Sequence, residues 1–214
     1  MNRLSNENGR NISKTTTVGL IAGDYVILAA DKRATGGFEI YHKSVRKILR
    51  VDDYIAMTIS GLVADTQIIY ENAKYIAKRY ELNTGRKITI HSLSSYLGLI
   101  LNVYLRFIPY IVQLLIGGYD SNGPQIYYLD LFGTVSREKY MATGSGSPIA
   151  LGVLEENYRS NMDLEEAVEL AYNSVYSAIT RDGYSGEGID IVIIGPGVYR
   201  EETRLFKHEI ISQS

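Results

Sequence analysis

The sequence contains no cysteine, which excludes disulfide bonds, thiolate metal sites and a cysteine nucleophile. Its three histidines, His42, His91 and His208, stand far apart, so the pattern gives no support for a histidine metal cluster. No apolar run reaches the roughly 18 residues that a membrane-spanning helix needs. A net charge of -2 argues against general binding to nucleic acid or to a membrane surface.

Nucleotide-binding and serine-hydrolase motifs are also missing. The glycine-rich stretch at 144–147 lacks the lysine of a phosphate-binding loop, and no G-x-G-x-x-G follows a strand. No G-x-S-x-G motif stands between a predicted strand and a predicted helix. The stretch at 144–147 is therefore interpreted as a turn that precedes a helix, and we expect no metal or organic cofactor.

The 214 residues are enough for one domain with a substantial core, and no repeat or linker divides them. Residues 1–14 are polar and lack the apolar region of a secretory signal, which favours a disordered leader and a cytoplasmic location. We expect residues 15–214 to form a single domain.

Hydrophobic periodicity predicts strands, then two helices, then strands, two helices and a last strand. The predicted strands are 15–22, 25–31, 38–42, 47–51, 54–60, 111–116, 125–131, 140–143 and 189–194. The predicted helices begin at 62, 88, 149 and after the capping-box residue Asp163. This order indicates an α+β domain in which two antiparallel sheets pack face to face, with a pair of helices on each outer side.

Three threonines in a row, Thr15, Thr16 and Thr17, stand at the boundary between the leader and the first predicted strand. Because threonine favours strands, an edge strand with solvated hydroxyl groups is the simpler interpretation of this triplet. A threonine that becomes the first residue of the chain would instead carry both a nucleophile and a base, its own α-amine. Such a site needs a nearby cation and carboxylate, and Lys47 and Asp31 supply candidates for both.

At these residues the chain resembles a β subunit of the archaeal 20S proteasome, a member of the N-terminal-nucleophile hydrolases. The resemblance extends from Thr15 to the last predicted strand and rests on the stretches TTTVG, LAADKRAT, HKSVRKI, ISGLVAD, ATGSGSP and RDGYSGEGID. It implies that Thr15 is the nucleophile, that Asp31 holds the catalytic Lys47, and that the N–H of Gly61 forms the oxyanion hole. It also implies that Ser145, Asp182 and Ser185 support the N-terminus.

The same resemblance implies a threonine endopeptidase that is made as a zymogen and frees Thr15 by autocatalytic cleavage after Lys14. The family usually has glycine at that position, and lysine lacks the backbone freedom that self-cleavage uses. An unprocessed, noncatalytic scaffold subunit that supports an active sister subunit in the same ring is therefore the alternative. The presence of the complete set of catalytic and supporting residues favours the enzyme.

The resemblance further implies that the substrate pocket is uncharged, which predicts cleavage after apolar residues of unfolded polypeptides. The implied partners are other β subunits in a heptameric ring, the α-subunit rings of the 20S core and, indirectly, an ATP-dependent regulatory ring. The positions implied to bind substrate are Ala34, Thr35, Val45, Ile59, Val63 and Gln67.

Overall fold

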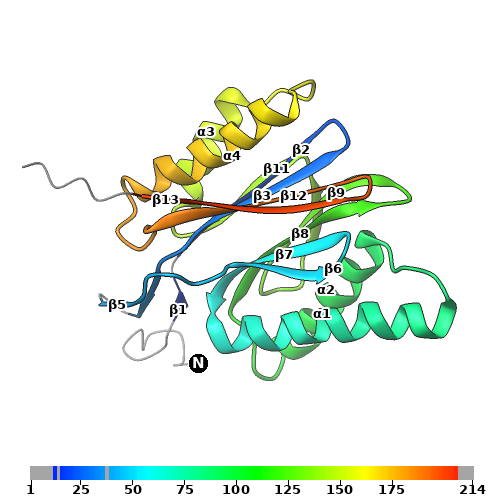
Figure 1. Ribbon diagram of the computed structural model, residues 1–214. Coiled ribbons are helices and arrows are strands. Elements are labelled where there is room, and N and C mark those ends of the chain that lie inside the picture. The colour runs from blue at the N-terminus through cyan, green and yellow to red at the C-terminus, as the bar shows by residue number, and fades with distance from the viewer. Residues whose placement is uncertain (1–11, 14, 37–38, 207–214) are drawn as a thin grey trace, which may run out of the picture.

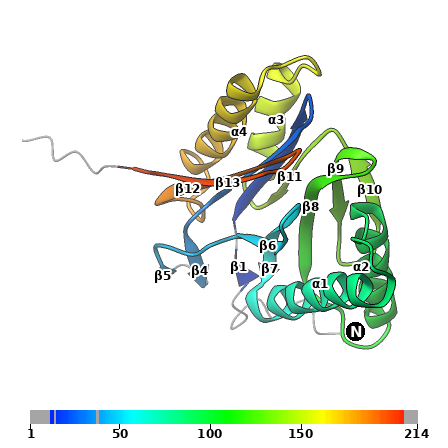
Figure 2. The same ribbon diagram turned by 45° about the vertical axis from the view of Figure 1, so that its right-hand side comes forward.

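The computed structural model describes residues 12–13, 15–36 and 39–206. In this part of the chain, two antiparallel sheets lie face to face, and a pair of helices covers the outer face of each sheet (Figure 1). The view in Figure 2 shows the same layers, with α3 and α4 on one side and α1 and α2 on the other. The predicted αββα sandwich is thereby confirmed.

The first sheet is built around β7, which pairs with both β6 and β8. Its order is β1-β7-β8-β9-β10, with β6 paired to β7 off this path. The strands are β1 (Ile12–Ser13), β6 (Ile48–Asp52), β7 (Ile55–Leu62), β8 (Val112–Asp120), β9 (Gly123–Leu129) and β10 (Val135–Glu138). Helices α1 (Val63–Thr84) and α2 (Ile90–Leu105) bury their apolar side chains against it.

The second sheet has the order β11-β2-β3-β12-β13. Its strands are β2 (Thr16–Ala22), β3 (Tyr25–Asp31), β11 (Tyr140–Gly144), β12 (Gly188–Gly195) and β13 (Val198–Leu205). Helices α3 (Ser147–Asn157) and α4 (Leu164–Ile179) pack on its outer face. The predicted capping residue is confirmed, because the Asp163 side chain accepts a hydrogen bond from the N–H of Glu166.

A separate cluster of apolar side chains fills the space between the two sheets. It includes Val26 and Leu28 of β3, Ala56 of β7, Leu115 of β8 and Val192 of β12, all almost completely buried. Towards one end of the sandwich the contacts between the sheets become polar: Thr17 Oγ1 donates to Thr58 Oγ1 at 3.0 Å. Candidate catalytic residues lie at this polar end.

Four strands of the structure were not predicted: β1, β4, β10 and β13. Of these, β4 (Ala34–Gly36) forms a separate hairpin with β5 (Glu39–His42), which was expected. The expectation of a wholly disordered leader is wrong for Ile12–Ser13, which pair with the end of β7 opposite Leu62 and Gly61. The remaining leader residues lie outside the described part of the chain.

Candidate active site

Three predicted residues meet at the polar end of the sandwich. Lys47 Nζ donates to Thr15 Oγ1 at 2.5 Å and to Asp31 Oδ1 at 2.8 Å. The Thr15 hydroxyl in turn donates to Asp31 Oδ1 at 2.6 Å. All three side chains are buried, and their positions in the sequence are 16 residues apart in each step. The hydroxyl oxygen of Thr15 therefore lies between a buried cation and a buried carboxylate.

Asp31 is placed by the end of β3, where its carboxylate gathers hydrogen bonds from several directions. Besides the two side-chain donors, Oδ1 accepts from the N–H of Thr16 at 3.0 Å. Oδ2 accepts from the N–H of Arg33 at 3.1 Å and from the N–H of Gly186 at 3.0 Å. Together these donors fix the orientation of the carboxylate. Asp31 can therefore hold the Lys47 ammonium in one position.

The electrostatic state of Lys47 depends on this pair. Burial lowers the pKa of Lys47 below its ordinary value, because an ammonium without water is unfavourable, while the Asp31 charge and hydrogen bond act in the opposite direction. Lys47 immediately precedes β6. Its backbone carbonyl accepts a hydrogen bond from Ile59 of β7 at 2.9 Å, which ties it to the first sheet.

A second polar cluster lies beside Thr15 and Thr16. The Thr16 hydroxyl bonds the Ser185 hydroxyl at 2.8 Å, and Ser185 donates to Asp182 Oδ2 at 2.8 Å. The Ser145 hydroxyl lies 2.7 Å from the same Asp182 oxygen and 3.4 Å from the backbone oxygen of Thr15. The structure thus brings Ser145, Asp182 and Ser185 together next to Thr15. The contribution of the Thr16 hydroxyl was not predicted, although it belongs to the threonine triplet.

Gly61 near the end of β7 has a backbone that only glycine adopts without strain. Its φ is +119°, and a Cβ atom at this position would overlap the backbone oxygen of Ile111. Gly61 and Lys47 line the same small cavity. The main chain of Gly61 is therefore held at the edge of a cavity that Lys47 also reaches.

This cavity, of about 100 Å³, is mainly apolar. Four of the six residues expected to bind substrate line it: Ala34, Val45, Ile59 and Val63. Its other described lining residues are His42, Lys47, Ser60, Gly61 and Thr66. Thr35 and Gln67 do not belong to this lining; Thr35 is buried in the β4–β5 hairpin and Gln67 is exposed on α1. The lining thus includes the amine of Lys47 and the imidazole of His42, neither of which was among the positions expected to bind substrate.

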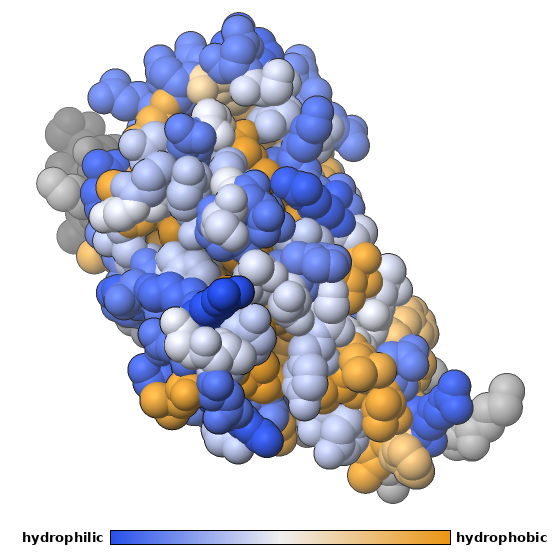
Figure 3. Space-filling view, turned by 90° about the vertical axis from the view of Figure 1, so that its right-hand side faces the viewer, coloured by the Kyte–Doolittle hydropathy of each residue, from blue (hydrophilic) through white to orange (hydrophobic). Residues whose placement is uncertain are grey.

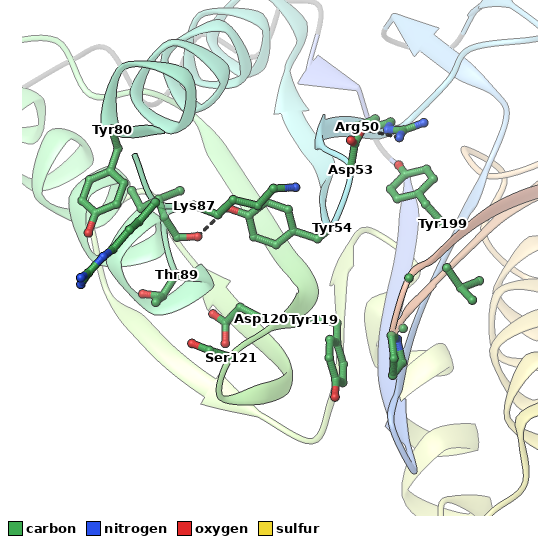
Figure 4. Close-up of a pocket in the computed structure, with 16 residues that line it drawn as sticks. Arg50, Asp53, Tyr54, Tyr80, Lys87, Thr89, Tyr119, Asp120, Ser121 and Tyr199 are labelled. Carbon is green, nitrogen blue, oxygen red and sulfur yellow. Dashed lines mark hydrogen bonds and ion pairs between the residues drawn. The ribbon is translucent and has the colours of Figure 1, made fainter. Parts of the chain in front are cut away.

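A larger cavity, of about 920 Å³, lies at the opposite end of the molecule, among the turns that join the strands. Figure 3 views this end, whose surface mixes hydrophilic side chains with apolar ones that gather towards α1 and α2. Figure 4 shows Tyr54 and Lys87 side by side in the cavity, with Lys87 Nζ 4.6 Å from the Tyr54 ring centre. The Tyr54 hydroxyl donates to the backbone oxygen of Ile88, and burial raises the pKa of Tyr54. Tyr54 is thus a structural donor rather than a base at neutral pH.

Within residues 12–13, 15–36 and 39–206, no group of three or more acidic or histidine side chains is arranged to hold a metal ion. The helices described here are also too short or too polar to span a bilayer.

Comparisons with known proteins agree with the geometry. The sequence profile of the proteasome subunit family matches residues 13–194. The chain is 64% identical over 202 residues to proteasome subunit beta 2 of Staphylothermus marinus, which covers 94% of this chain and 97% of that protein. It is 64% identical over 201 residues to proteasome subunit beta 2 of Desulfurococcus amylolyticus, covering 94% and 98%. It is also 48% identical over 181 residues to proteasome subunit beta 1 of Pyrobaculum calidifontis, covering 84% and 90%. The chain therefore belongs to the proteasome family, as a β subunit of the archaeal 20S type.

Proposed function

We propose that this subunit is catalytic and that Thr15 is the nucleophile of a threonine endopeptidase. The observation that carries the proposal is the position of Thr15 Oγ1, which contacts both Lys47 Nζ and Asp31 Oδ1. A subunit that served only as a scaffold would gain little from burying a lysine, because desolvating its charge is unfavourable. A catalytic role explains this burial, because the Thr15 nucleophile needs the Lys47 charge beside it.

The base in this mechanism is the α-amine that cleavage between Lys14 and Thr15 would release. Its reference pKa is roughly 7.7 to 8.0, which suits a general base near neutral pH. A charged Lys47 nearby disfavours protonation of the amine and stabilises negative charge on Thr15 Oγ1. Asp31 keeps Lys47 charged and oriented.

The α-amine takes the proton from Thr15 Oγ1 as this oxygen attacks the scissile carbonyl. The peptide C–N bond then breaks, and the leaving amine departs with that proton. Water hydrolyses the acyl ester that remains on Thr15 and frees the hydroxyl again. The N–H of Gly61 stabilises the oxyanion, an interaction worth roughly 3 to 4 kcal/mol for a single donor in a serine protease. Ser145, Asp182 and Ser185 hold the first residues of the mature chain in place. Their hydrogen bonds to one another and to Thr16 support this assignment.

The described part of the leader, β1, lies beside the site. Thr15 is completely buried while the chain continues into β1, and β1 pairs with β7 at Gly61. Residues 1–14 would therefore be a propeptide, and autocatalytic removal would open the cleft to substrate. Lys14 itself lies outside the described residues, so the cleavage site is proposed from the sequence.

Substrate preference follows from the cavity beside Lys47. Its apolar walls gain roughly 1.5 to 3 kcal/mol from burying a large apolar side chain. They offer no carboxylate to offset the desolvation of Arg or Lys, and the buried Lys47 ammonium would repel either cation. The enzyme should therefore cut after apolar residues.

As a proteasome β subunit, the protein assembles with other β subunits and with α subunits in the 20S core. We propose the finer setting from the family: a heptameric β ring in the cytoplasm, where an ATP-dependent regulatory ring passes unfolded polypeptides into the chamber. Degradation inside a closed chamber fits a protease whose own cavity is small.

The test compares assembled core particles that carry wild-type subunit, Thr15→Ala or Thr84→Ala. Thr84 donates to the backbone oxygen of Tyr80 on the exposed surface of α1, so it controls for the loss of a threonine hydroxyl elsewhere. Thr15→Ala should abolish cleavage of fluorogenic peptides and still assemble, whereas Thr84→Ala should be fully active. Equal activity of Thr15→Ala and wild type would rule out the mechanism. An inactive wild-type particle would favour the scaffold alternative.

A further inference from the structure

Glu187 has an unusual backbone conformation. Its φ is +70°, and no other non-glycine residue among those described has a positive φ. A Cβ atom makes this conformation unfavourable, so it persists where the surroundings impose it. Glu187 closes the loop between α4 and β12, the same loop that carries Asp182 and Ser185.

The side chain of Glu187 is engaged by Arg33, which follows β3. Glu187 Oε1 accepts from Arg33 Nη2 at 3.0 Å and from Nε at 3.3 Å. The Arg33 guanidinium also donates, through Nη1, to the backbone oxygen of Gly183 at 2.9 Å. Arg33 therefore holds the loop at two points, Gly183 and Glu187, on either side of Ser185.

Between these two points the loop reaches the catalytic carboxylate. The N–H of Gly186 donates to Asp31 Oδ2, and the backbone oxygen of Gly186 accepts from the N–H of Lys32 at 3.1 Å. The Arg33 guanidinium packs directly on Gly186, so close that a Cβ atom at residue 186 would overlap the guanidinium. The Gly186 peptide is thus held between the guanidinium on one side and Asp31 on the other.

We propose that Arg33 and Glu187 form a clamp that positions the Gly186 N–H on Asp31 and keeps Asp182 and Ser185 beside Thr15. Both are positioning residues that act on the nucleophile through Asp31 and the loop. The inference rests on the proposed catalytic function of Thr15 and extends it to two residues outside the catalytic set.

A purely structural role accounts poorly for glutamate at this position. A glycine would adopt φ +70° without strain, and a partly exposed ion pair contributes little to stability. A glutamate in this backbone conformation is better explained by its ion pair with Arg33. The carboxylate fixes the guanidinium that lies against Gly186.

The experiment uses assembled particles with Glu187→Gly, Glu187→Gln and, as a control, Glu81→Gln. Glu187→Gly removes the carboxylate and relieves the backbone, so the thermal midpoint should stay equal or rise. Its kcat should fall at least about tenfold, because a displaced catalytic group lowers the rate without changing substrate binding, and its KM should stay unchanged. Glu187→Gln keeps an acceptor for Arg33 and should recover part of kcat. Glu81 forms a similar 2.8 Å ion pair with Lys78 on α1, and its variant should behave as wild type.

Adding Arg33→Lys to Glu187→Gly should lower kcat no further than the larger single effect, since both changes open the same clamp. Wild-type kcat in Glu187→Gly would overturn the proposal, and so would a loss of activity that only follows a lower thermal midpoint in both Glu187 variants. Hydrogen exchange at the Gly186 amide gives an answer that does not require activity. Faster exchange in Glu187→Gly supports the clamp, and unchanged protection overturns it even if wild type proves inactive and the catalytic proposal fails.

Discussion

Ser13 lies opposite Gly61 in the antiparallel pairing of β1 with β7. The strand that ends the leader therefore runs along the same glycine that we propose as the oxyanion donor. β1 also contacts β4, so this strand lies between β4 and the end of β7. An extended substrate that added a strand to β7 would need the same place, and leader removal must then precede cleavage of other chains.

The residue before Thr15 should set the rate of that removal. Lys14→Gly should speed loss of the leader, because glycine gives the cleaved turn more backbone freedom. Lys14→Ala should process at the wild-type rate, since it removes the charge without adding that freedom. The measurement is intact mass over time after assembly begins. Equal rates for Lys14→Gly and wild type would show that residue 14 does not limit processing.

The pH dependence of the activity should report on Lys47. Burial lowers the pKa of Lys47, and the Asp31 charge and hydrogen bond are the main effects that raise it, with a smaller one from Asp182; Asp31→Asn should therefore let the pKa fall further. Lys47 would then lose its proton at a lower pH, and the alkaline limb of kcat/KM should move to lower pH. The acid limb of kcat/KM should move to higher pH. An uncharged Lys47 no longer disfavours protonation of the α-amine, so the pKa of this amine rises.

The measurement is a pH–rate profile with an uncharged peptide substrate. Asp53→Asn provides the control, because Asp53 forms an exposed ion pair with Arg50. Its profile should match that of wild type. An alkaline limb that stays in place or moves to higher pH in Asp31→Asn would contradict the role given to this pair.

Gly61 should tolerate no side chain. A Cβ atom at φ +119° would overlap the Ile111 oxygen, so Gly61→Ala must shift the end of β7 away from β8. We expect a loss of about 1–3 kcal/mol in stability and a fall of at least about 100-fold in kcat. Gly152 on α3 has open space around it, and Gly152→Ala should stabilise the helix by about 0.5–1 kcal/mol with unchanged activity. Normal kcat in Gly61→Ala would exclude its N–H as a precisely placed donor.

Ile59 should decide which side chain the small cavity accepts. Ile59→Glu places a carboxylate in the lining, which should lower kcat/KM after Tyr and raise it after Arg. The measurement is a panel of fluorogenic peptides that differ only at the residue before the cut. Gln67→Glu is the matched control, because Gln67 is exposed on α1 and lies outside the lining. An unchanged Tyr-to-Arg ratio in Ile59→Glu would mean that another surface selects substrates.

Local sequence signals predicted the layers well. Gly23 and Asp24 mark the turn between β2 and β3, and the helical periodicities correspond to α1 to α4. β13 was missed because its sequence VYREETRL is rich in charged residues, and its side chains are mostly exposed at the edge of the sheet. Its pairing with the fully buried β12 comes from backbone hydrogen bonds, which leave no hydrophobic pattern in the sequence.

The candidate site shows the same division. Thr15, Asp31 and Lys47 were recognised because their flanking motifs resemble those of a known family, and the structure brings them together. Arg33 and Glu187 are 154 residues apart, and neither their residue types nor their spacing indicates a contact. They meet because β3 pairs with β12 in the folded chain. This pairing places Arg33, just after β3, against Glu187, just before β12.

The intact mass of this subunit, taken from the assembled particle, tests the central claim most directly. A catalytic Thr15 requires a free α-amine, so the account predicts a chain that has lost residues 1–14 and begins at Thr15. A fully assembled particle in which the subunit keeps its leader would contradict the catalytic role and would leave the scaffold function in its place.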